Sequence, residues 1–404
     1  MDKPFAVGHE RKAELVAPAG DADRLKVALG YGADAVYLAG KKLGMRAACR
    51  NFDGDGLKSA ALAVHALNKK IYVAANIFPS DADFDGFDEY ADFLGEIGVD
   101  GVIASDLGII NRLLKRTALS VHVSTQANVM NSETARVYAD MGVKRIVLAR
   151  ELSVSQIRRI RDGLDDGVSL EAFVHGATCI SYSGRCLLSS YMSGRSANRG
   201  ECNQACRMEF APVGGDGMEF VEDGGTYIFG GNDINMIEHL GELRDAGVEA
   251  FKIEGRVKSE YYVGCIVNAY RKAVDAMLGG AELPRDVAEE PKKAPNRGFN
   301  TGFYYGMPER AEVKPEYYDF CGIVVGRDER GATVEMRNRF GTGDVLEVLS
   351  PDARFQNKLV TVPVMTGEDG TAVTDAKVPC ARLLFGGVDL PELSMLRRPK
   401  QKQP

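Results

Sequence analysis

The sequence predicts an α/β protein: a (β/α)8 TIM-like barrel with an inserted cysteine-rich segment, followed by a small C-terminal β-barrel domain. Short apolar runs alternate with amphipathic helical stretches about eight times between residues 14 and 278. A related phrase recurs as GADAVY, GVDGVI, GVKRIV and GVEAFK, where a glycine follows a helix and a buried strand then begins. From about residue 317 the pattern changes to period-two alternation between Gly/Asp turns, which is typical of short antiparallel strands.

The elements follow one another along the chain in a regular order. Residues 1–13 contain no apolar run of signal-peptide length and are expected to form a disordered leader. Eight apolar runs should then form strands, each joined to the next by a helix. An open doubly wound sheet is the alternative, but no G-x-G-x-x-G follows the first strand, so dinucleotide binding has no support. The expected strands are ELVAPAG, AVYLAG, KIYVAANI, GVIAS, SVHVSTQ, RIVLARE, LEAFVHG and AFKIEGR.

Domain boundaries follow from shifts in composition. We expect the barrel at 14–278 with the cysteine-rich segment at 171–207, because 261–278 has the apolar spacing of a last barrel helix. Residues 279–315 turn rich in Pro, Glu and Lys and then aromatic, which indicates a linker and docking segment. The β-barrel should occupy 316–390, and 391–404 should form a tail.

Composition limits the function classes. The formal net charge of −7 and a pI near 5.5 argue against binding to nucleic acid that is mainly non-specific. No apolar run reaches the length of a membrane span, so we expect a cytoplasmic protein without a membrane partner. One local cationic group stands out, because Arg185, Arg195, Arg199 and Arg207 all lie within the cysteine-rich segment. They are either solvated loop arginines or a surface for phosphates or an anionic substrate.

Half of the eight cysteines lie within 28 residues of the cysteine-rich segment. Cys179, Cys186, Cys202 and Cys206 are separated by six, fifteen and three residues. Disulfides are disfavoured in a cytosolic protein. Zinc sites usually pair their ligands closely on both sides, and only Cys202 and Cys206 are that close. Iron–sulfur ligation suits four thiolates on an irregular loop, while zinc and reactive or structural thiols stay open on spacing alone.

The pattern E-x-F-x-H-G-A-x-C-x6-C-L-L-S begins at Glu171, and the chain also contains LVAPAGD, GADAVYLAG, SVHVSTQANVMN and FKIEGRVKSEYYV. Together these motifs resemble those of the collagenase-like peptidase family of unassigned catalytic type, and the resemblance covers about residues 15–310. That family includes prephenate-dependent tRNA uridine hydroxylases of the wobble position, a ribosomal RNA cytidine hydroxylase and hydroxylases of ubiquinone synthesis. The resemblance implies that Cys179, Cys186, Cys202 and Cys206 bind a 4Fe–4S cluster.

Polar residues end most of the expected strands, so the barrel mouth should carry both cations and carboxylates. We expect Gln126 and His175 to orient the oxygen donor or the acceptor base, as the catalytic pair. Arg185, Arg199, Lys252 and Arg256 are expected to bind carboxylates or phosphates of the substrates.

The leading hypothesis is therefore a dioxygen-independent hydroxylase that forms 5-hydroxyuridine in the anticodon region of tRNA, with prephenate as the expected small anionic co-substrate. Three alternatives stay open: a peptidase using Cys179 with His175 or a serine such as Ser183 or Ser189, an accessory subunit of quinone hydroxylation, and a hydroxylase of another RNA. G-x-S-x-G and H-E-x-x-H, which would favour proteolysis, are absent from the sequence.

Overall fold

The computed structural model describes residues 13–46, 50–208, 231–309, 311 and 318–400. Nearly all of the expected leader therefore lies outside the described residues, as do the last four residues of the expected tail. Within the described part of the chain, no helix combines the length and the apolar character needed to cross a membrane.

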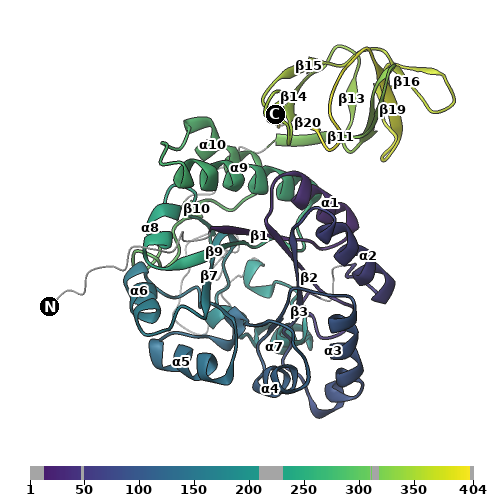
Figure 1. The fold of residues 1–404 in the computed structure, drawn as a ribbon. Helices are drawn as coiled ribbons and strands as arrows, with labels where there is room; N and C mark the ends of the chain where they lie inside the picture. The colour runs from purple at the N-terminus through teal and green to yellow at the C-terminus, as the bar shows by residue number, and fades with distance from the viewer. Residues whose placement is uncertain (1–12, 47–49, 209–230, 310, 312–317, 401–404) are drawn as a thin grey trace, which may run out of the picture.

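Eight parallel strands close into a barrel, as the alternation in the sequence predicts. Neighbouring strands pair in chain order, and the ring closes because the eighth barrel strand, β9, pairs with both β1 and β7. Figure 1 shows the helices arranged around this ring. The barrel strands are β1 (Glu14–Pro18), β2 (Ala35–Leu38), β3 (Lys70–Ala75), β4 (Gly101–Ala104), β5 (Val121–Val123), β6 (Arg145–Val147), β7 (Ser169–Ala177) and β9 (Val248–Ile253).

The outer helices begin and end where the sequence supplies caps. Asp21, Asp53, Asp106 and Asn131 each accept a hydrogen bond from a backbone N–H of the first turn of their helix. The four repeated glycines all have positive φ, between 73° and 103°, which explains the recurring phrase. The helices of the ring are α1 (Ala22–Gly30), α2 (Gly54–His65), α3 (Phe87–Glu96), α4 (Leu107–Arg116), α5 (Ser132–Met141), α6 (Val154–Asp162), α8 (Leu240–Asp245) and α9 (Glu260–Leu278).

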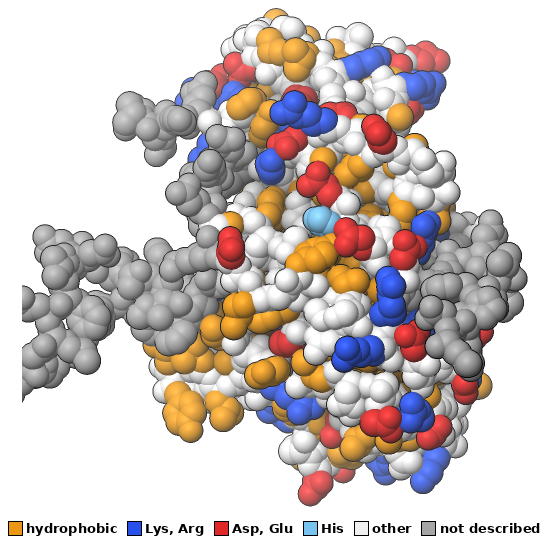
Figure 2. All heavy atoms as spheres, turned by 90° about the vertical axis from the view of Figure 1, so that its left-hand side faces the viewer, with side chains coloured by type: hydrophobic (Ala, Val, Ile, Leu, Met, Phe, Trp, Pro, Cys, Tyr) orange, Lys and Arg blue, Asp and Glu red, His pale blue; other side chains and the backbone are white. Residues whose placement is uncertain are grey.

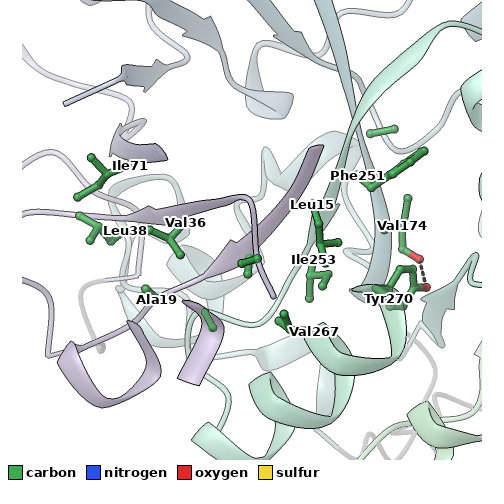
Figure 3. Close-up of a cluster of buried hydrophobic side chains, with 14 of the residues drawn as sticks. Leu15, Ala19, Val36, Leu38, Ile71, Val174, Phe251, Ile253, Val267 and Tyr270 are labelled. Carbon is green, nitrogen blue, oxygen red and sulfur yellow. Dashed lines mark hydrogen bonds between the residues drawn. The ribbon is translucent and has the colours of Figure 1, made fainter. Parts of the chain in front are cut away.

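The layer between strands and helices is apolar. Leu15 of β1 and Ile253 of β9 lie near Val267 and Tyr270 of α9, and Figure 3 shows this packing at the point where the barrel closes. The Tyr270 hydroxyl donates a hydrogen bond of 2.7 Å to the Val174 carbonyl of β7. Because these side chains are almost completely buried, they fix α9 against β7 and β9.

Ion pairs, in contrast, fill part of the barrel interior. Arg145 Nη1 lies 2.7 Å from Glu14 and 3.0 Å from Glu171, and Lys252 Nζ lies 2.5 Å from the other oxygen of Glu171. Glu171 is fully buried. Each of these charges therefore has a counter-ion inside the barrel, as buried charges require.

Two short strands extend the sheet beyond the ring. β8 (Asp233–Asn235) pairs antiparallel with the end of β7, and β10 (Phe299–Asn300) pairs with β8. The expected linker therefore contains regular structure, including α10 (Arg285–Glu289) and the short helix η6 (Glu290–Lys293), because its apolar and acidic side chains pack against α9 and the C-terminal domain.

The C-terminal domain is an antiparallel β-sheet domain with its own apolar core. Among the described residues its main sheet has eight strands, and a further two-stranded sheet accompanies it. The main strands are β11 (Tyr318–Asp328), β12 (Gly331–Met336), β14 (Val345–Leu349), β15 (Leu359–Thr361), β16 (Met365–Thr366), β17 (Ala372–Val373), β19 (Arg382–Gly386) and β20 (Met395–Pro399); β13 (Phe340–Gly341) and β18 (Asp375–Ala376) form the small sheet.

The expected tail boundary at residue 390 is wrong. β20 pairs with both β11 and β14, so it lies in the middle of the main sheet. Its Arg397 is fully buried and binds Glu290 of η6 and Glu347 of β14. Arg397 also lies 3.5 Å from the sulfur of Cys265 in α9, so it joins the domain to the barrel there, and Figure 1 shows the domain on the α9 side of the barrel.

Candidate active site at the mouth of the barrel

A cavity of about 200 Å³ opens at the carboxyl ends of the barrel strands. Tyr37 of β2, Phe173 of β7 and Lys252 of β9 line it from the barrel side. Asn76 and Gln126, which follow β3 and β5, add amide groups to its wall. The sequence predicts this location, because side chains at the carboxyl ends of barrel strands converge there.

The cysteine-rich segment covers this cavity as a series of short turns. Three loops of the barrel hold it in place: Glu151 accepts hydrogen bonds from the N–H and hydroxyl of Ser183, the Gln126 carbonyl accepts from Arg185, and Asp83 pairs with Arg199. The segment is thus fixed over the mouth rather than loosely attached. Its helical turns are η3 (Tyr182–Gly184), α7 (Leu188–Ser193), η4 (Ala197–Arg199) and η5 (Ala205–Arg207).

All four cysteines of the segment line the same cavity. Burial raises the pKa of the Cys206 thiol; Arg207 opposes this, and negative charge on Cys179, Cys202 and Cys186 raises the pKa further. Charge on the other three cysteines therefore acts on Cys206, and thiolates at these positions would repel without a cationic centre between them. Within the described ranges, no three His, Cys, Asp or Glu side chains converge as the ligands of a single metal ion would.

Positive charge exceeds negative charge around the cavity. Among the residues that the structure describes, six cationic side chains line it, against one carboxylate, Glu254. Burial would raise the pKa of Glu254, but Arg46, Arg150 and Arg256 outweigh burial and lower it. The cavity therefore favours an anionic occupant. The cationic side chains are Arg46, Arg150, Arg207, Lys252, Arg256 and Lys258.

The surplus charge concentrates at Arg207 and Lys258. Neither has a carboxylate within ion-pair distance among the described residues, whereas Lys252 is paired with Glu171 and Arg150 with Glu254 at 3.1 Å. Burial is the main reason why the pKa values of Lys258 and Arg207 are lowered, and the nearby charge of Arg297 adds to it. An anion beside these two cations would relieve both effects.

Gln126 lies where the sequence predicts a site residue. It is buried in the cavity wall, its side-chain oxygen accepts a hydrogen bond of 2.7 Å from Asn76, and its amide nitrogen faces the sulfur of Met45. Lys252 and Arg256 also line the cavity, and Arg256 donates to the Met45 carbonyl. Gln126, Lys252 and Arg256 therefore line the same cavity as the four cysteines.

His175 does not line the cavity, which corrects its expected position. Its ring is buried on the outer side of β7 against Tyr270, Tyr262 and Phe299. Burial lowers its pKa to about 3, so the ring is neutral at physiological pH. The cause is a register shift between Phe173 and His175 in the pairing with β9, which changes the side of the strand on which the ring lies.

Arg185 and Arg199 are also absent from the cavity wall. Arg185 donates to the Gln126 carbonyl at 2.6 Å and lies over the ring of Phe78. Arg199 makes two hydrogen bonds to the carboxylate of Asp83, at 2.7 and 2.8 Å. Both therefore attach the cysteine-rich segment to the barrel instead of facing the cavity.

Two residues that line the cavity, Arg46 and Lys258, could not be predicted from the ends of the expected strands. Arg46 lies in the loop after β2, with Nη2 3.7 Å from Glu254, and Lys258 lies just before α9. Both follow their strands by several residues, and no periodic pattern marks them. Lys258 does fall within the motif FKIEGRVKSEYYV, which was the available signal.

The fold and the site together define a (β/α)8-barrel protein with a four-thiol segment over its mouth and an appended antiparallel β domain. The chain belongs to peptidase family U32, whose model matches residues 20–314; the family's C-terminal domain model matches 316–397.

Three relatives illustrate the range of proteins that the chain resembles. It is 36% identical to tRNA hydroxylation protein P1 of Bacillus subtilis (strain 168), over 93% of this chain and 92% of that protein. It is 42% identical to an uncharacterized protease of Methanocaldococcus jannaschii, over 72% of this chain and 73% of that protein. A 23S rRNA 5-hydroxycytidine synthase of Escherichia coli (strain K12) is 38% identical over 66% of this chain and 40% of that protein.

Proposed function

We propose that this chain is an RNA hydroxylase that forms 5-hydroxyuridine at the wobble position of tRNA, in the cytoplasm, without dioxygen. One observation carries the proposal: four cysteines and a surplus of cationic side chains share a single cavity at the mouth of a barrel. Relatives named for tRNA hydroxylation and for 5-hydroxycytidine synthesis support hydroxylation of a pyrimidine in RNA.

The four cysteines fit a 4Fe–4S cluster better than a single ion. Such a cluster takes one thiolate at each of its irons, so its ligands surround a wide centre. This agrees with four thiols around one cavity and with the lack, in the described residues, of a close three-residue site for one ion. When bound, the cluster would supply one-electron redox chemistry. Its net negative charge would be balanced by Arg46 and Arg207, whose charges reach the cysteines.

The other side chains of the cavity would bind and orient the reactants. A small dianion, for which prephenate is our candidate, would sit against Arg207 and Lys258, the cations without a carboxylate partner among the described residues. Gln126, held by Asn76, would present its amide to the acceptor base or the donor. Replacing a ring hydrogen by a hydroxyl removes two electrons from the base, so the donor of the oxygen must accept them.

The experiment is deletion of the gene in its source organism, followed by mass spectrometry of nucleosides from purified tRNA. We expect 5-hydroxyuridine and nucleosides derived from it to disappear, and to return with the wild-type gene or the Cys265→Ser gene. The Cys206→Ser gene should not restore them. Unchanged tRNA nucleosides together with loss of a modified cytidine from ribosomal RNA would show that the acceptor is a different RNA.

Proteolysis is not favoured by the geometry. Among the described residues no histidine lines the cavity, and His175, the expected partner of Cys179, is buried on the outer side of β7. The thiol of Cys179 lies 3.0 Å from the hydroxyl of Ser181, which is not a base. A cysteine nucleophile needs a base within hydrogen-bond distance, and none is in place here.

A further inference from the structure

The outer surface of the cysteine-rich segment is unusually apolar for an exposed loop. Between residues 180 and 192, Tyr191 is 86% exposed and Tyr182 is 63% exposed, and Ile180, Leu187 and Met192 are also largely exposed. Large apolar side chains that cluster on a surface usually mark a binding site.

This surface lies directly outside the cavity. Ser189 of α7 lines the cavity and is only 2% exposed, whereas Tyr191, two residues later, points to solvent. Ser183 and Gly184 line the cavity as well, and Tyr182 directly precedes them. Both tyrosines therefore lie on the segment whose inward-facing residues line the cavity with the four cysteines.

The same stretch carries no negative charge. Residues 172–200 contain no Asp or Glu, although acidic residues make up 57 of the 404 in the chain. Of the three arginines here, Arg199 is neutralised by Asp83, while Arg185 and Arg195 have no carboxylate partner within the described ranges. By contrast, Figure 2 shows Lys and Arg mixed with Asp and Glu on the face over α5, α6 and α8.

We propose that Tyr182 and Tyr191 form a stacking platform for unpaired bases of the acceptor RNA, with Arg185 and Arg195 beside its phosphates. This inference rests on the proposed function and deepens it. Exposed aromatic rings together with cations that have no carboxylate partner among the described residues suit a single-stranded nucleic acid, because bases stack on the rings and the cations attract the backbone. A second copy of this chain or an apolar protein would not need a stretch free of acidic residues.

The test uses the full-length, iron-loaded protein under anaerobic conditions. Fluorescence anisotropy measures its affinity for a labelled anticodon stem-loop and for a duplex of the same stem without the loop. We expect Tyr191→Ala and Tyr182→Ala each to weaken binding of the stem-loop about tenfold and to leave duplex binding unchanged, since loss of one stacked base has effects of this order. Tyr191→Phe keeps the ring and should bind as the wild type does. Tyr305→Ala, at an exposed tyrosine beside α8, serves as the control.

The arginines have a separate readout. Arg185→Gln and Arg195→Gln should each reduce the slope of log affinity against log salt concentration by about 0.7, as expected for one lost phosphate contact to a single strand. A stem-loop affinity that is unchanged in the Tyr182→Ala/Tyr191→Ala double variant would overturn the inference. A wild-type dimer that this double variant converts to monomer, in analytical ultracentrifugation, would also overturn it, because the surface would then join two copies.

Hydroxylation is scored independently, from the nucleosides of RNA treated with the same protein. Stem-loop binding that depends on the tyrosines, without any hydroxylated product, would refute the proposed function and leave the platform standing. Hydroxylated product together with binding that does not depend on the tyrosines would support the proposed function and refute the platform.

Discussion

Replacing Glu14 with glutamine should destabilise the barrel strongly at neutral pH and much less in acid. Glu14 is partly buried at the start of β1, where it accepts hydrogen bonds from Arg145 at 2.7 Å, Lys70 at 2.8 Å and Tyr72 at 2.8 Å. Burial alone would raise its pKa, but the charge and hydrogen bond of Arg145, with those of Lys70, lower it from 4.5 to about 2.

The size of the effect follows from linkage. A carboxylate with a lowered pKa stabilises the fold fully above its unfolded pKa, and this stabilisation disappears as the pH falls through the folded value. The fall from 4.5 to about 2 is worth about 3 kcal/mol, at about 1.36 kcal/mol for each pH unit. At pH 3 the same linkage relation gives a stabilisation of roughly 1.4 kcal/mol, about half of the value at pH 7.

Urea unfolding followed by circular dichroism at 222 nm measures this difference, because all helices in the described part of the chain precede residue 294. We expect the free energies of unfolding of wild type and Glu14→Gln to differ by about 3 kcal/mol at pH 7 and to converge toward pH 2. Asp53→Asn is the control: the pKa of this exposed helix cap is lowered only by the hydrogen bond from Gly56 and by Lys41, so its convergence in acid should be much smaller than that of Glu14→Gln. A difference for Glu14→Gln that is equal at pH 7 and pH 3 would refute the reasoning.

Three further predictions concern the site and the domain contact. Cys206→Ser should lose bound iron and sulfide after anaerobic reconstitution, whereas Cys265→Ser, buried in α9, should retain both; the reverse result would exclude the proposed ligand set. Arg397→Met removes the buried cation shared by Glu290 and Glu347 and leaves them only Lys293, so urea unfolding should show a loss of about 3 kcal/mol, the lower end for a broken buried pair. A loss below about 0.5 kcal/mol would contradict the role of this pair. Arg199→Ala removes a partly exposed ion pair with Asp83 that is worth about 0–1 kcal/mol, so the free energy of unfolding should change little. Amide hydrogen exchange in residues 196–201 should accelerate, and unchanged exchange would show that Asp83 does not anchor the segment.

The barrel could be predicted from the sequence because its signals are local. The helix caps and the glycines at Gly32, Gly98, Gly142 and Gly247 mark where each βα unit turns, and each acts through a few neighbouring residues. β20 gave no comparable signal. Its sequence MLRRP contains two arginines and does not resemble a buried strand. Arg397 is buried because it pairs with Glu290 and Glu347, which lie far away in the chain and give no local signal.

The site was predictable to the level of the strand end, but not to the level of the side-chain direction. Gln126, Lys252 and the four cysteines were found because they directly end a strand or share one loop. His175 was misplaced because a register shift in β7 depends on how β7 and β9 pair, which no short stretch encodes. Arg199 and Arg185 were misassigned because their partners, Asp83 and the Gln126 carbonyl, belong to other loops of the barrel.

The central position of β20 also bears on the order of assembly during synthesis. Every strand of the barrel is translated before β20. Until residues 395–399 have left the ribosome, the β domain lacks the strand between β14 and β11, and Glu290 lacks its ion pair with Arg397. The barrel and its cysteine-rich segment can therefore mature first. Docking of the β domain then becomes a late step, and in a nascent chain stalled before β20 Glu290 would keep only Lys293 as a neutralising neighbour.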